Sequence, residues 1–582
     1  MNRRLRRQQK KQGRRSMRAK GLLSSDDVIA LLNGALADLD AGAAAKAYEA
    51  SVRVLGDFPD NDDAVRIAAH AAFRMTSIEQ SVDAMRRLVS LMPGDASLGN
   101  DLGGLLCHEG AFDEAESVLR QALGLDPVNA EIHANLGQAL MGLKRPNEAE
   151  LVFRQAIAAN DRLAAAENGL GSALEAQDCL DDAVECYRRA VDLDPESLAA
   201  RKNFEKALIA TGAGFDERER LCRRDLEAAP GDNGLSIKLA GILRDTDRIN
   251  EARKLISAVL DVAPDTPQAR EMLSEIQFLD GDFKAAFENY EARLAGPWIH
   301  IRPHAQPLWR GEALRGKTIL VWGEQGIGDE LMFASLLPVL RDAGANVIVE
   351  CDPRLVVVFA RSFPWLICVP SEDEPSPLTR ASDIDFQVPI GSLGRFLWEE
   401  FQATTRRPYL CADPVRAEDL RETYQNGDDV KLIGVAWRSI NPSIGPHKST
   451  DLDTLAPLLS LPGVRGVDLQ YGETEIERAV LEETTGIHLV HDENIDQWHD
   501  LDGFAAQIAA LDMVISVSNT TVHFAAGLGI PTWVLLSTVP MWRWGSDHSA
   551  SPWYPGLRLF RQSQLGDWPG VINEVCEAFR AS

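Results

Sequence analysis

The chain has no long apolar segment, few cysteines and little positive charge beyond its first residues. No stretch of its 582 residues approaches the roughly 20 apolar residues that a membrane-spanning helix needs. Its eight cysteines are scattered without a CxxC pair, which favours a reducing compartment over a disulfide-bonded secreted domain. We therefore expect a cytoplasmic protein with no integral membrane contact.

Charge is divided unevenly along the chain. The first twenty residues carry ten Lys and Arg and no acid, whereas the remainder carries 50 basic against 87 acidic residues. An acidic body repels nucleic acid and anionic lipid, so we expect no nucleic-acid partner for it. Residues 1–25 are expected to form a basic tail without stable structure, whose charges suit a membrane surface, a nucleic acid or an acidic partner. No apolar run follows these charges, so the tail is not expected to be a signal peptide.

Prolines recur at intervals of 34 residues in the first half of the chain. They are Pro59, Pro93, Pro127, Pro195 and Pro264, with a slip of one residue at Pro230. Between them, Gly103, Gly137 and Gly171 are each followed twelve residues later by an alanine. Small residues let two antiparallel helices touch, and proline ends the second helix. The pattern resembles the tetratricopeptide repeat, whose period is 34 residues. It predicts an array over residues 26–295, with repeats ending at 59, 93, 127, 161, 195, 230 and 264 and a degenerate eighth reaching about Leu294.

The second half of the chain alternates short β-branched runs with helical stretches. The predicted strands are 318–323, 346–351, 386–390, 432–437, 466–471, 513–518, 532–536 and 557–561. Strands spaced by helices indicate parallel sheets, and two such sets indicate two doubly wound domains, at 296–412 and 413–582. Ligands bind at the carboxyl ends of such strands, so the loops that follow them are the candidate site.

A glycine-rich loop follows the first predicted strand. It contains Gly326 and Gly328 and leads through Asp329 into a helix. Glycines permit close backbone approach, and the N–H groups of the helix start favour an anion or a polarised hydroxyl. A plain helix-capping role for Asp329 is the alternative. The nearby Gly311, Gly316, Lys317 and Thr318 spell a GxxxxGK[ST] phosphate loop, but a strand follows them where a helix is required, so we reject that interpretation.

Two further loops follow strands of the second set. The first contains Arg438 and Lys448, two cations able to neutralise a diphosphate, with ordinary surface charge as the alternative. The second begins with Asn519, Thr520 and Thr521 and continues to His523. Hydroxyls and amides at a helix start hydrogen-bond phosphate oxygens, although a histidine of the core is the alternative for His523.

Five segments together resemble bacterial glycosyltransferases with two Rossmann-like domains, close to the heptosyltransferase-like family that is often fused to tetratricopeptide repeats. They are 323–338 (GEQGIGDELMFASLLP), 434–449 (GVAWRSINPSIGPHKS), 469–479 (LQYGETEIERA), 515–531 (ISVSNTTVHFAAGLGIP) and 542–562 (WRWGSDHSASPWYPGLRLFRQ). The order of the domains is also similar to that of protein O-linked N-acetylglucosamine transferases and of soluble transferases that modify flagellin. The implied fold class is α + α/β, a tetratricopeptide-repeat superhelix followed by a GT-B glycosyltransferase with its acceptor side in 296–412 and its nucleotide-sugar side in 413–582.

The resemblance also implies roles for single residues. Asp329 matches the catalytic base, and the cations and helix-start residues match the cradle of the donor diphosphate. Glu473 or Glu477 matches the acid that meets the ribose. The implied nucleotide-sugar site comprises Gly326, Gly328, Arg438, Lys448, Tyr471, Glu477, Asn519, Thr520, Thr521 and His523. Ser518 departs from the family, in which Asp is common at this position.

The predicted function is that of a soluble inverting O-glycosyltransferase, which moves a sugar from a UDP- or CMP-linked donor to Ser or Thr of a protein acceptor. It implies no further cofactor and no metal, since cations at the loops replace one, and the acidic run at 383–385 is not expected to bind a metal. The repeats would recruit the acceptor, for which flagellin is our specific hypothesis on the resemblance alone. Two alternatives are a transferase to a lipid or polysaccharide and a repeat scaffold with an inactive transferase domain.

Overall fold

A computed structural model of the protein describes residues 23–75, 77–212, 214–296, 299, 301–404, 407–441, 445–539, 541–545 and 551–581. The chain forms two compact units, Met1–Thr211 and Gly212–Ser582. Most of the expected tail, residues 1–22, lies outside the described residues. The first described helix begins at Ser25 after a capping box in which Ser24 Oγ accepts from Asp27 N at 3.3 Å and the Asp27 carboxylate accepts from Ser24 N at 3.0 Å.

Helix pairs repeat along residues 25–290, as the proline lattice predicts. The helices are α2 (Ser25–Asp40), α3 (Ala44–Asp57), α4 (Asp62–Phe73), α5 (Ile78–Leu91), α6 (Ala96–Glu109), α7 (Phe112–Leu125), α8 (Ala130–Gly142), α9 (Pro146–Ala159), α10 (Ala164–Glu175), α11 (Leu180–Leu193), α12 (Leu198–Ala210), α13 (Phe215–Ala228), α14 (Asn233–Asp245), α15 (Ile249–Val262), α16 (Pro267–Leu279) and α17 (Phe283–Tyr290). The eighth pair, α16 and α17, is complete and ends in the 3-10 helix η1 (Glu291–Ala295).

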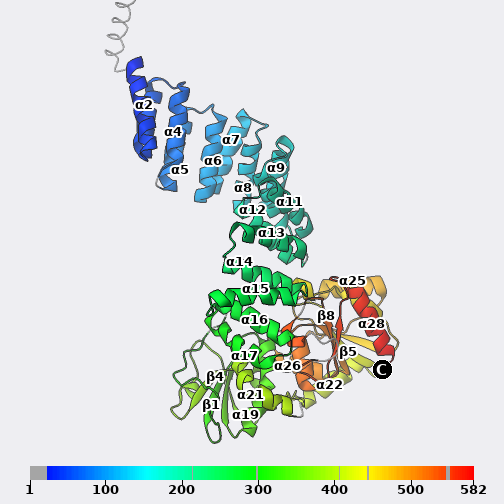
Figure 1. Ribbon diagram of the computed structural model, residues 1–582. Coiled ribbons are helices and arrows are strands. Elements are labelled where there is room, and N and C mark those ends of the chain that lie inside the picture. Colours follow the sequence, from blue (N-terminus) through cyan, green and yellow to red (C-terminus); the bar gives the residue numbers. More distant parts are fainter. Residues whose placement is uncertain are drawn as a thin grey trace, which may run out of the picture. The chain divides into compact units, whose positions relative to one another are not determined.

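Small residues set the approach of the two helices within a pair. A methyl group at Gly103 would lie 2.4 Å from Leu119, and one at Gly137 would lie 2.6 Å from the Phe153 ring. Both distances are too short for a side chain larger than glycine, and Leu119 and Phe153 are fully buried. Successive helix pairs in the first unit lie side by side (Figure 1).

The first sheet contains four parallel strands in the order β3-β2-β1-β4. They are β1 (Thr318–Trp322), β2 (Asn346–Cys351), β3 (Ile367–Pro370) and β4 (Phe386–Pro389), accompanied by α18 (Ile327–Ala334), α19 (Leu337–Asp342), α20 (Val356–Ser362) and α21 (Leu393–Ala403). Three of these strands are predicted within a residue or two. The sequence reasoning missed β3, because this edge strand is short and ends in proline, a residue that argues against a strand except at an edge.

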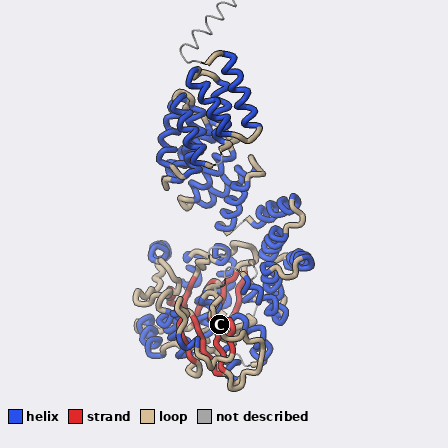
Figure 2. The backbone as a smooth tube through the Cα atoms, turned by 90° about the vertical axis from the view of Figure 1, so that its left-hand side faces the viewer, coloured by secondary structure: helices blue, strands red, loops and turns tan. Residues whose placement is uncertain are grey.

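The second sheet contains five parallel strands in the order β6-β5-β7-β8-β9. They are β5 (Lys431–Ala436), β6 (Val464–Asp468), β7 (Met513–Val517), β8 (Thr532–Leu536) and β9 (Arg558–Arg561), accompanied by α22 (Pro414–Gln425), α23 (Gly445–Lys448), α24 (Ala456–Leu459), α25 (Glu475–Thr485), α26 (Leu501–Ala509), α27 (Thr520–Leu528) and α28 (Trp568–Arg580). The strands of the second unit lie among helices in Figure 2. Such cover explains why these strands are almost continuously apolar.

The predicted strand at 466–471 begins two residues and ends three residues too late, since β6 covers Val464–Asp468. The strand β6 ends at Asp468, whose buried carboxylate accepts from Gln470 N at 2.9 Å and from Thr474 Oγ1 at 2.7 Å. These two bonds turn the chain out of the sheet. Tyr471 therefore lies in a loop after the strand.

The last repeats belong to the same compact unit as the two sheets, Gly212–Ser582. Phe278 of α16 stacks on Trp542, which lies between β8 and β9, with 4.7 Å between the ring centres. Phe283 of α17 stacks on Trp398 of α21 at 4.3 Å. Trp398 in turn contacts Trp553 at 4.8 Å. One aromatic cluster thus joins the eighth repeat to both sheets.

A buried ion pair reinforces this junction. Arg293 of η1 donates to both carboxylate oxygens of Glu324, at 2.9 and 2.5 Å, and Glu324 also accepts from Gly391 N at 2.8 Å. Tyr290 OH donates to Gln325 Oε1 at 3.0 Å. The eighth repeat therefore holds the loop that follows β1.

We predict that fragment 296–582 unfolds at a lower temperature than fragment 212–582. The shorter fragment lacks Arg293 and therefore loses the ion pair and the hydrogen bonds that Arg293 forms with Glu324. It also loses aromatic pairs that contribute about 0.5–1.5 kcal/mol each beyond their burial. Calorimetry of both fragments and the full chain measures the difference. Equal melting temperatures would show that the eighth repeat is a separate module.

Candidate functional site

The candidate site lies where the strand order of each sheet reverses. In the first sheet the chain leaves β1 beside β4, and in the second it leaves β5 beside β7. Ligands of doubly wound folds bind outside the carboxyl ends of strands at such points. The three predicted loops begin at these strand ends, at Gly323, Trp437 and Ser518.

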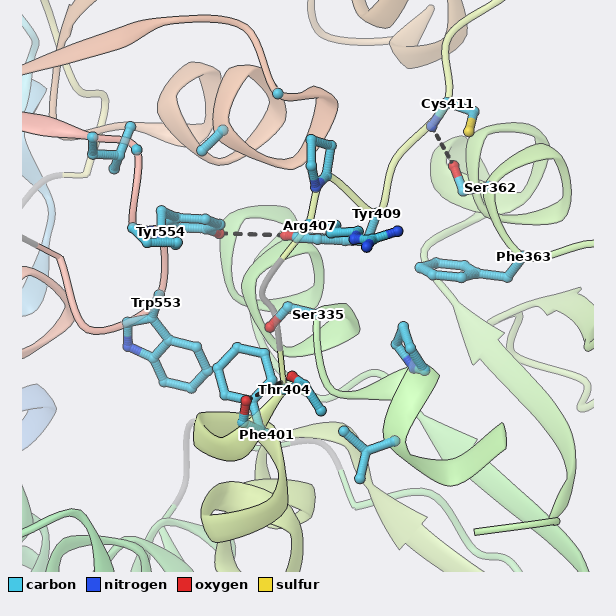
Figure 3. Close-up of a pocket in the computed structure, with 18 of the residues that line it drawn as sticks. Ser335, Ser362, Phe363, Phe401, Thr404, Arg407, Tyr409, Cys411, Trp553 and Tyr554 are labelled. Atoms are coloured by element: carbon cyan, nitrogen blue, oxygen red, sulfur yellow. Dashed lines mark hydrogen bonds between the residues drawn. The ribbon is translucent and has the colours of Figure 1, made fainter. Parts of the chain in front are cut away.

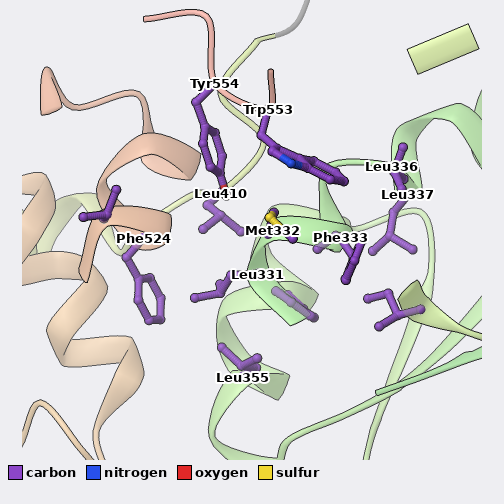
Figure 4. Packing of buried hydrophobic residues seen from close by; sticks show 14 of the residues in the cluster. Leu331, Met332, Phe333, Leu336, Leu337, Leu355, Leu410, Phe524, Trp553 and Tyr554 are labelled. Carbon is purple, nitrogen blue, oxygen red and sulfur yellow. The ribbon is translucent and has the colours of Figure 1, made fainter. Parts of the chain in front are cut away.

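The glycine loop after β1 touches the start of α27 in the second sheet's segment. Gly326 is the N-cap of α18, and a methyl group at Gly328 would lie 3.3 Å from His523 Cδ2 and 3.5 Å from Thr520 Oγ1. Glycine at 328 therefore permits the close approach of two loops. Behind them, Leu331 and Phe333 of α18 lie in one buried cluster with Phe524 and Tyr554 (Figure 4).

Asp329 is held by an arginine that the sequence reasoning did not assign. Arg543 donates to Asp329 Oδ1 through Nε at 3.0 Å and through a second guanidinium nitrogen. Asp329 lies in the first turn of α18, whose N-cap is Gly326 and has no side-chain cap bond. The capping alternative for Asp329 thus has no support in its contacts. Burial alone would lower the pKa of Arg543, but the Asp329 carboxylate raises it above its usual value.

Arg543 lies between two tryptophans in the 3-10 helix η6 (Trp542–Trp544). Its guanidinium carbon is 4.7 Å from the centre of the Trp542 ring, and Trp544 Nε1 donates to Ser518 Oγ at 2.8 Å. Ser518, which departs from the family pattern, therefore anchors the helix that carries Arg543. The sequence feature that could have indicated this arginine is its position between two tryptophans, Trp542 and Trp544.

Lys448 is a buried cation without a partner in the described part of the chain. Only 9% of the residue is exposed, and its ammonium group has no hydrogen bond or ion pair there. Burial, followed by the charge of Arg543, lowers the pKa of Lys448 to about 7, and Asp329 opposes the shift. With Arg543, it lines a cavity of about 110 Å³. This volume suits a phosphate-sized group, not a whole nucleotide sugar.

His523 lies in the second turn of α27 and is 5% exposed. Its Nδ1 is 3.0 Å from Tyr554 OH, and its ring stacks on Trp544 at 5.4 Å. Burial, followed by the charge of Arg543, lowers the pKa of His523 to about 3. The histidine is therefore neutral at physiological pH. Its contacts are with Tyr554, Trp544 and the glycine loop at Gly328.

Arg438 and Glu477, predicted for the diphosphate and the ribose, bind each other. Arg438 lies 2.8 Å from a Glu477 carboxylate oxygen and donates to the Glu473 carbonyl at 2.8 Å. Trp437 Nε1 also donates to Glu477, at 3.0 Å. Both side chains are about one-third exposed, so a ligand has access to them.

Of the remaining predicted residues, some form hydrogen bonds or packing contacts within the fold and others have a hydroxyl without a partner or lie beside the glycine loop. Asn519 caps α27 by accepting from Thr521 N at 3.1 Å, and its amide donates to the Arg438 carbonyl at 3.3 Å. The buried Thr521 hydroxyl has no partner among the residues described, whereas Thr520 is half-buried beside Gly328. Tyr471 is buried with its ring 5.8 Å from that of Trp498. The structure thus brings Asp329, Gly328, Thr520, His523 and Lys448 to one place.

A second cavity, of about 840 Å³, lies at the other end of α27 (Figure 3). It is lined by Gly529 and by residues 407–409 of the link between the sheets. A helix C-terminus carries partial negative charge and disfavours phosphate. We therefore place the candidate anion site at the smaller cavity.

No group of three or more His, Cys, Asp or Glu side chains among the described residues is arranged to hold a metal ion. None of the helices in the same residues combines the length and the apolar character needed to cross a bilayer.

Family profiles for the tetratricopeptide repeat match residues 106–171, 168–197 and 237–298. The chain carries tetratricopeptide repeats. This result confirms the prediction for the array, and the last match reaches into the unit that contains the sheets. Such repeats are modules for binding peptides and proteins.

The chain is also similar to named proteins. It is 30% identical over 344 residues to Protein FlbA of Caulobacter vibrioides, a match covering 55% of this chain and 57% of FlbA. It therefore spans little more than half the length of that relative. Among solved structures, a thermophilic TPR protein of Thermus thermophilus shows 21% identity over 31% of this chain and 99% of its own, with a TM-score of 0.25. MamA of Desulfovibrio magneticus RS-1 shows 15% identity over 30% and 99%, with a TM-score of 0.27. Scores this low carry no argument about function.

We predict that Lys448 makes the binding of a nucleotide sugar depend on pH. Its ammonium is charged below about pH 7 and neutral above, so affinity for a diphosphate should fall by up to about tenfold per pH unit above 7. Calorimetric titration with UDP-N-acetylglucosamine and with a CMP-linked sugar acid measures this slope. Lys448→Met should bind more weakly and lose the slope, whereas parallel pH profiles for both proteins would contradict the assignment.

Proposed function

We propose that the chain is an inverting O-glycosyltransferase of the GT-B type that uses a nucleotide-sugar donor and a protein acceptor. The observation that carries the proposal is the charge arrangement at the sheet ends. Lys448, which is buried, and Arg543, which is half-buried, are cations that line one cavity, and Asp329 is the carboxylate paired with Arg543. A buried ammonium without a counter-ion is costly, so its presence favours a substrate that brings negative charge.

The donor's leaving group provides that charge. In the proposed step, an acceptor hydroxyl loses its proton to an Asp329 carboxylate oxygen while the hydroxyl oxygen attacks the anomeric carbon. The bond from that carbon to the phosphate oxygen breaks, and the nucleotide departs with the electron pair. Lys448 and Arg543 stabilise the charge that develops on the departing phosphate.

Asp329 and Arg543 exchange partners in this scheme. In the ligand-free protein the guanidinium of Arg543 donates to the Asp329 carboxylate. A donor phosphate competes for the same guanidinium. Donor binding would therefore release Asp329 to accept the proton, which couples the base to the occupied donor site.

The repeats offer a surface suited to an extended peptide. Asn135 Nδ2 donates to Asn100 Oδ1 at 2.9 Å, and Asn203 repeats the contact with Asn168 at 3.0 Å. Asn100 and Asn135 line a groove of about 690 Å³. Amide side chains both donate to and accept from a peptide backbone, so this groove supports recruitment of a protein acceptor. Flagellin remains our specific hypothesis, on family resemblance.

Donor class and acceptor class are tested separately. Thermal shifts with a panel of UDP- and CMP-linked sugars should reveal one donor, since a ligand at 100 times its dissociation constant stabilises by about 2.7 kcal/mol. Mass spectrometry of flagellin and total protein from a deletion strain then reports the lost modification. A loss confined to lipid or polysaccharide would favour the other acceptor class, and no binding in the panel would favour a scaffold.

We predict that Asp329→Asn slows sugar transfer by a factor of about 10²–10⁴, because the amide cannot accept the acceptor's proton. Donor affinity should stay the same or rise, since Arg543 is freed for phosphate. Glu330→Gln is the matched control. Burial raises the pKa of Glu330 to about 8, so this neighbouring carboxyl is already protonated at neutral pH. The Glu330→Gln variant should therefore transfer sugar at the normal rate.

Initial rates and melting temperatures of both variants decide the role of Asp329. Turnover near the wild-type rate in Asp329→Asn would remove it from the catalytic role. An equal loss in Glu330→Gln would point to disruption of α18 instead of loss of the base.

We predict that Asn100→Ala combined with Asn135→Ala weakens acceptor capture. The double variant loses two amides of the groove, each of which contributes about 0.5–1.5 kcal/mol through a hydrogen bond. KM for the protein acceptor should rise while kcat and donor affinity stay unchanged. An unchanged KM would exclude this groove from recruitment.

A further inference from the structure

The last repeats form part of the cavity that we assign to the donor phosphate. Arg244 and Asp245 of α14 and Glu275 of α16 line it together with Lys448 and Arg543. Arg244 donates to Asp245 through Nε at 2.9 Å and also forms an ion pair with Glu275. Both carboxylates that the repeats bring to this cavity are thus already paired with a cation.

A repeat also contacts the short helix that carries Lys448. The ring of Phe215, at the start of α13, stacks on His447 of α23, with 5.0 Å between the ring centres and 22° between the planes. Phe215 is 9% exposed and His447 is 6% exposed, so the stack is buried. Beside it, a methyl group at Gly212 would lie 3.1 Å from Pro446 Cβ. The backbone at Gly212 therefore also touches α23.

The helix α23 needs such contacts because it is only four residues long. Isolated helices shorter than about 12 residues are marginal in water, so tertiary contacts must hold α23 in place. Within its own loop, Ser449 Oγ donates to the Gly445 carbonyl at 2.8 Å. The stack with Phe215 fixes the same helix against the repeats.

We propose that Phe215 is a positioning residue of the sixth repeat, which holds Lys448 in the phosphate cavity through His447. The inference rests on the proposed function only for the identity of the anion, a phosphate of the nucleotide-sugar donor. Phe215 does not itself line the cavity, whereas His447 and Lys448 do. It therefore acts through α23 and not by touching the ligand.

His447 can lie against Phe215 because it carries no charge. Burial lowers the pKa of His447, an effect that Asp245 opposes and Arg218 reinforces, so the ring is neutral at physiological pH. A neutral imidazole stacks on a phenyl ring without the cost of a buried charge. The residue next to Lys448 in the chain therefore adds no positive charge to the cavity.

Holding α23 against the repeats also keeps Lys448 buried. Burial is the largest cause that lowers the pKa of Lys448 to about 7, followed by the charge of Arg543, and Asp329 opposes the shift. Loss of the contact with Phe215 would let water reach α23 and relieve the main cause. The pKa of Lys448 should then rise toward the ordinary value for lysine, about 10.4.

Competitive labelling with acetic anhydride tests this in the full-length protein without any nucleotide. Only a neutral amine reacts, so the yield of the acetylated Lys448 peptide, followed by mass spectrometry across pH, reports the titration of this lysine. Wild-type labelling should titrate near pH 7. Labelling of Phe215→Ala should titrate at least about one pH unit higher.

Binding of inorganic pyrophosphate measures the positioning of the charge separately from its titration. At about pH 6 the Lys448 ammonium is charged in both proteins. Affinity in calorimetric titration should still fall about two- to tenfold in Phe215→Ala, because the ammonium is no longer held in place before the anion binds. The decline of affinity between about pH 7 and pH 8 should also become smaller in this variant.

Phe204→Ala is the matched control. Phe204 of α12 is a fully buried phenylalanine of the same repeat, but it lies in the other compact unit. Its removal should lower the melting temperature and leave the titration of Lys448 unchanged. Phe215→Leu keeps apolar volume without the ring stack, so it should shift the titration less, in the same direction. It is the second variant if Phe215→Ala does not fold.

An unchanged titration of Lys448 in a folded Phe215 variant overturns the proposal. An equal shift in Phe204→Ala overturns it as well, because the effect would then come from general destabilisation of the repeats. Failure of pyrophosphate and of all nucleotide sugars to bind the wild-type protein, with the lysine titration shifted as expected, would instead count against the proposed function.

Discussion

The buried ion pair between Arg293 and Glu324 is the constraint on which the candidate site depends. Glu324 lies in the loop that carries Gly326 and Gly328 and leads to Asp329, and Arg293 lies in the last element of the repeats. A buried carboxylate requires its cation, so the last repeat supplies the charge that compensates Glu324 in this loop. Around the pair, Phe278 and Phe283 reach tryptophans associated with both sheets. The eighth repeat is therefore part of the domain that carries the site.

This arrangement bears on how recruitment and chemistry are related. The array divides at Thr211 and Gly212, so its last helices serve the sheets while its earlier ones form a separate unit. The paired asparagines and their groove lie entirely in the earlier unit. Under the proposed function, acceptor selection and donor binding would then be free to change independently in sequence. Only the final repeats are constrained by both packing and the site.

The site itself is a balance of few charges in a buried space. Asp329 forms an ion pair with Arg543, while Lys448 has no ion pair or hydrogen bond among the described residues and burial lowers its pKa to about 7. Arg438 and Glu477 form a second, more exposed pair nearby in the chain's fold. Three cations are expected to bind phosphate. Arg543 and Arg438 are each paired with a protein carboxylate where the phosphate would bind, and Lys448 has a lowered pKa and is therefore only partly protonated at neutral pH. The ligand-free protein thus limits the electrostatic cost of holding a site for an anion.

The sequence by itself determined the elements and the loops. The 34-residue lattice predicted the helix pairs, and apolar runs predicted the bounds of seven of the nine described strands to within one residue, because such periodicities arise from contacts between near neighbours. It placed Asp329, Lys448 and His523 after strand ends for the same reason. Only the tertiary structure decided that Arg543 meets Asp329, 214 residues away in the chain, that Tyr554 meets His523, and that Arg438 meets Glu477. It also decided that the unit with the sheets begins at Gly212 and that β6 ends at Asp468. These outcomes depend on burial and on partners brought together by folding, which no local pattern records.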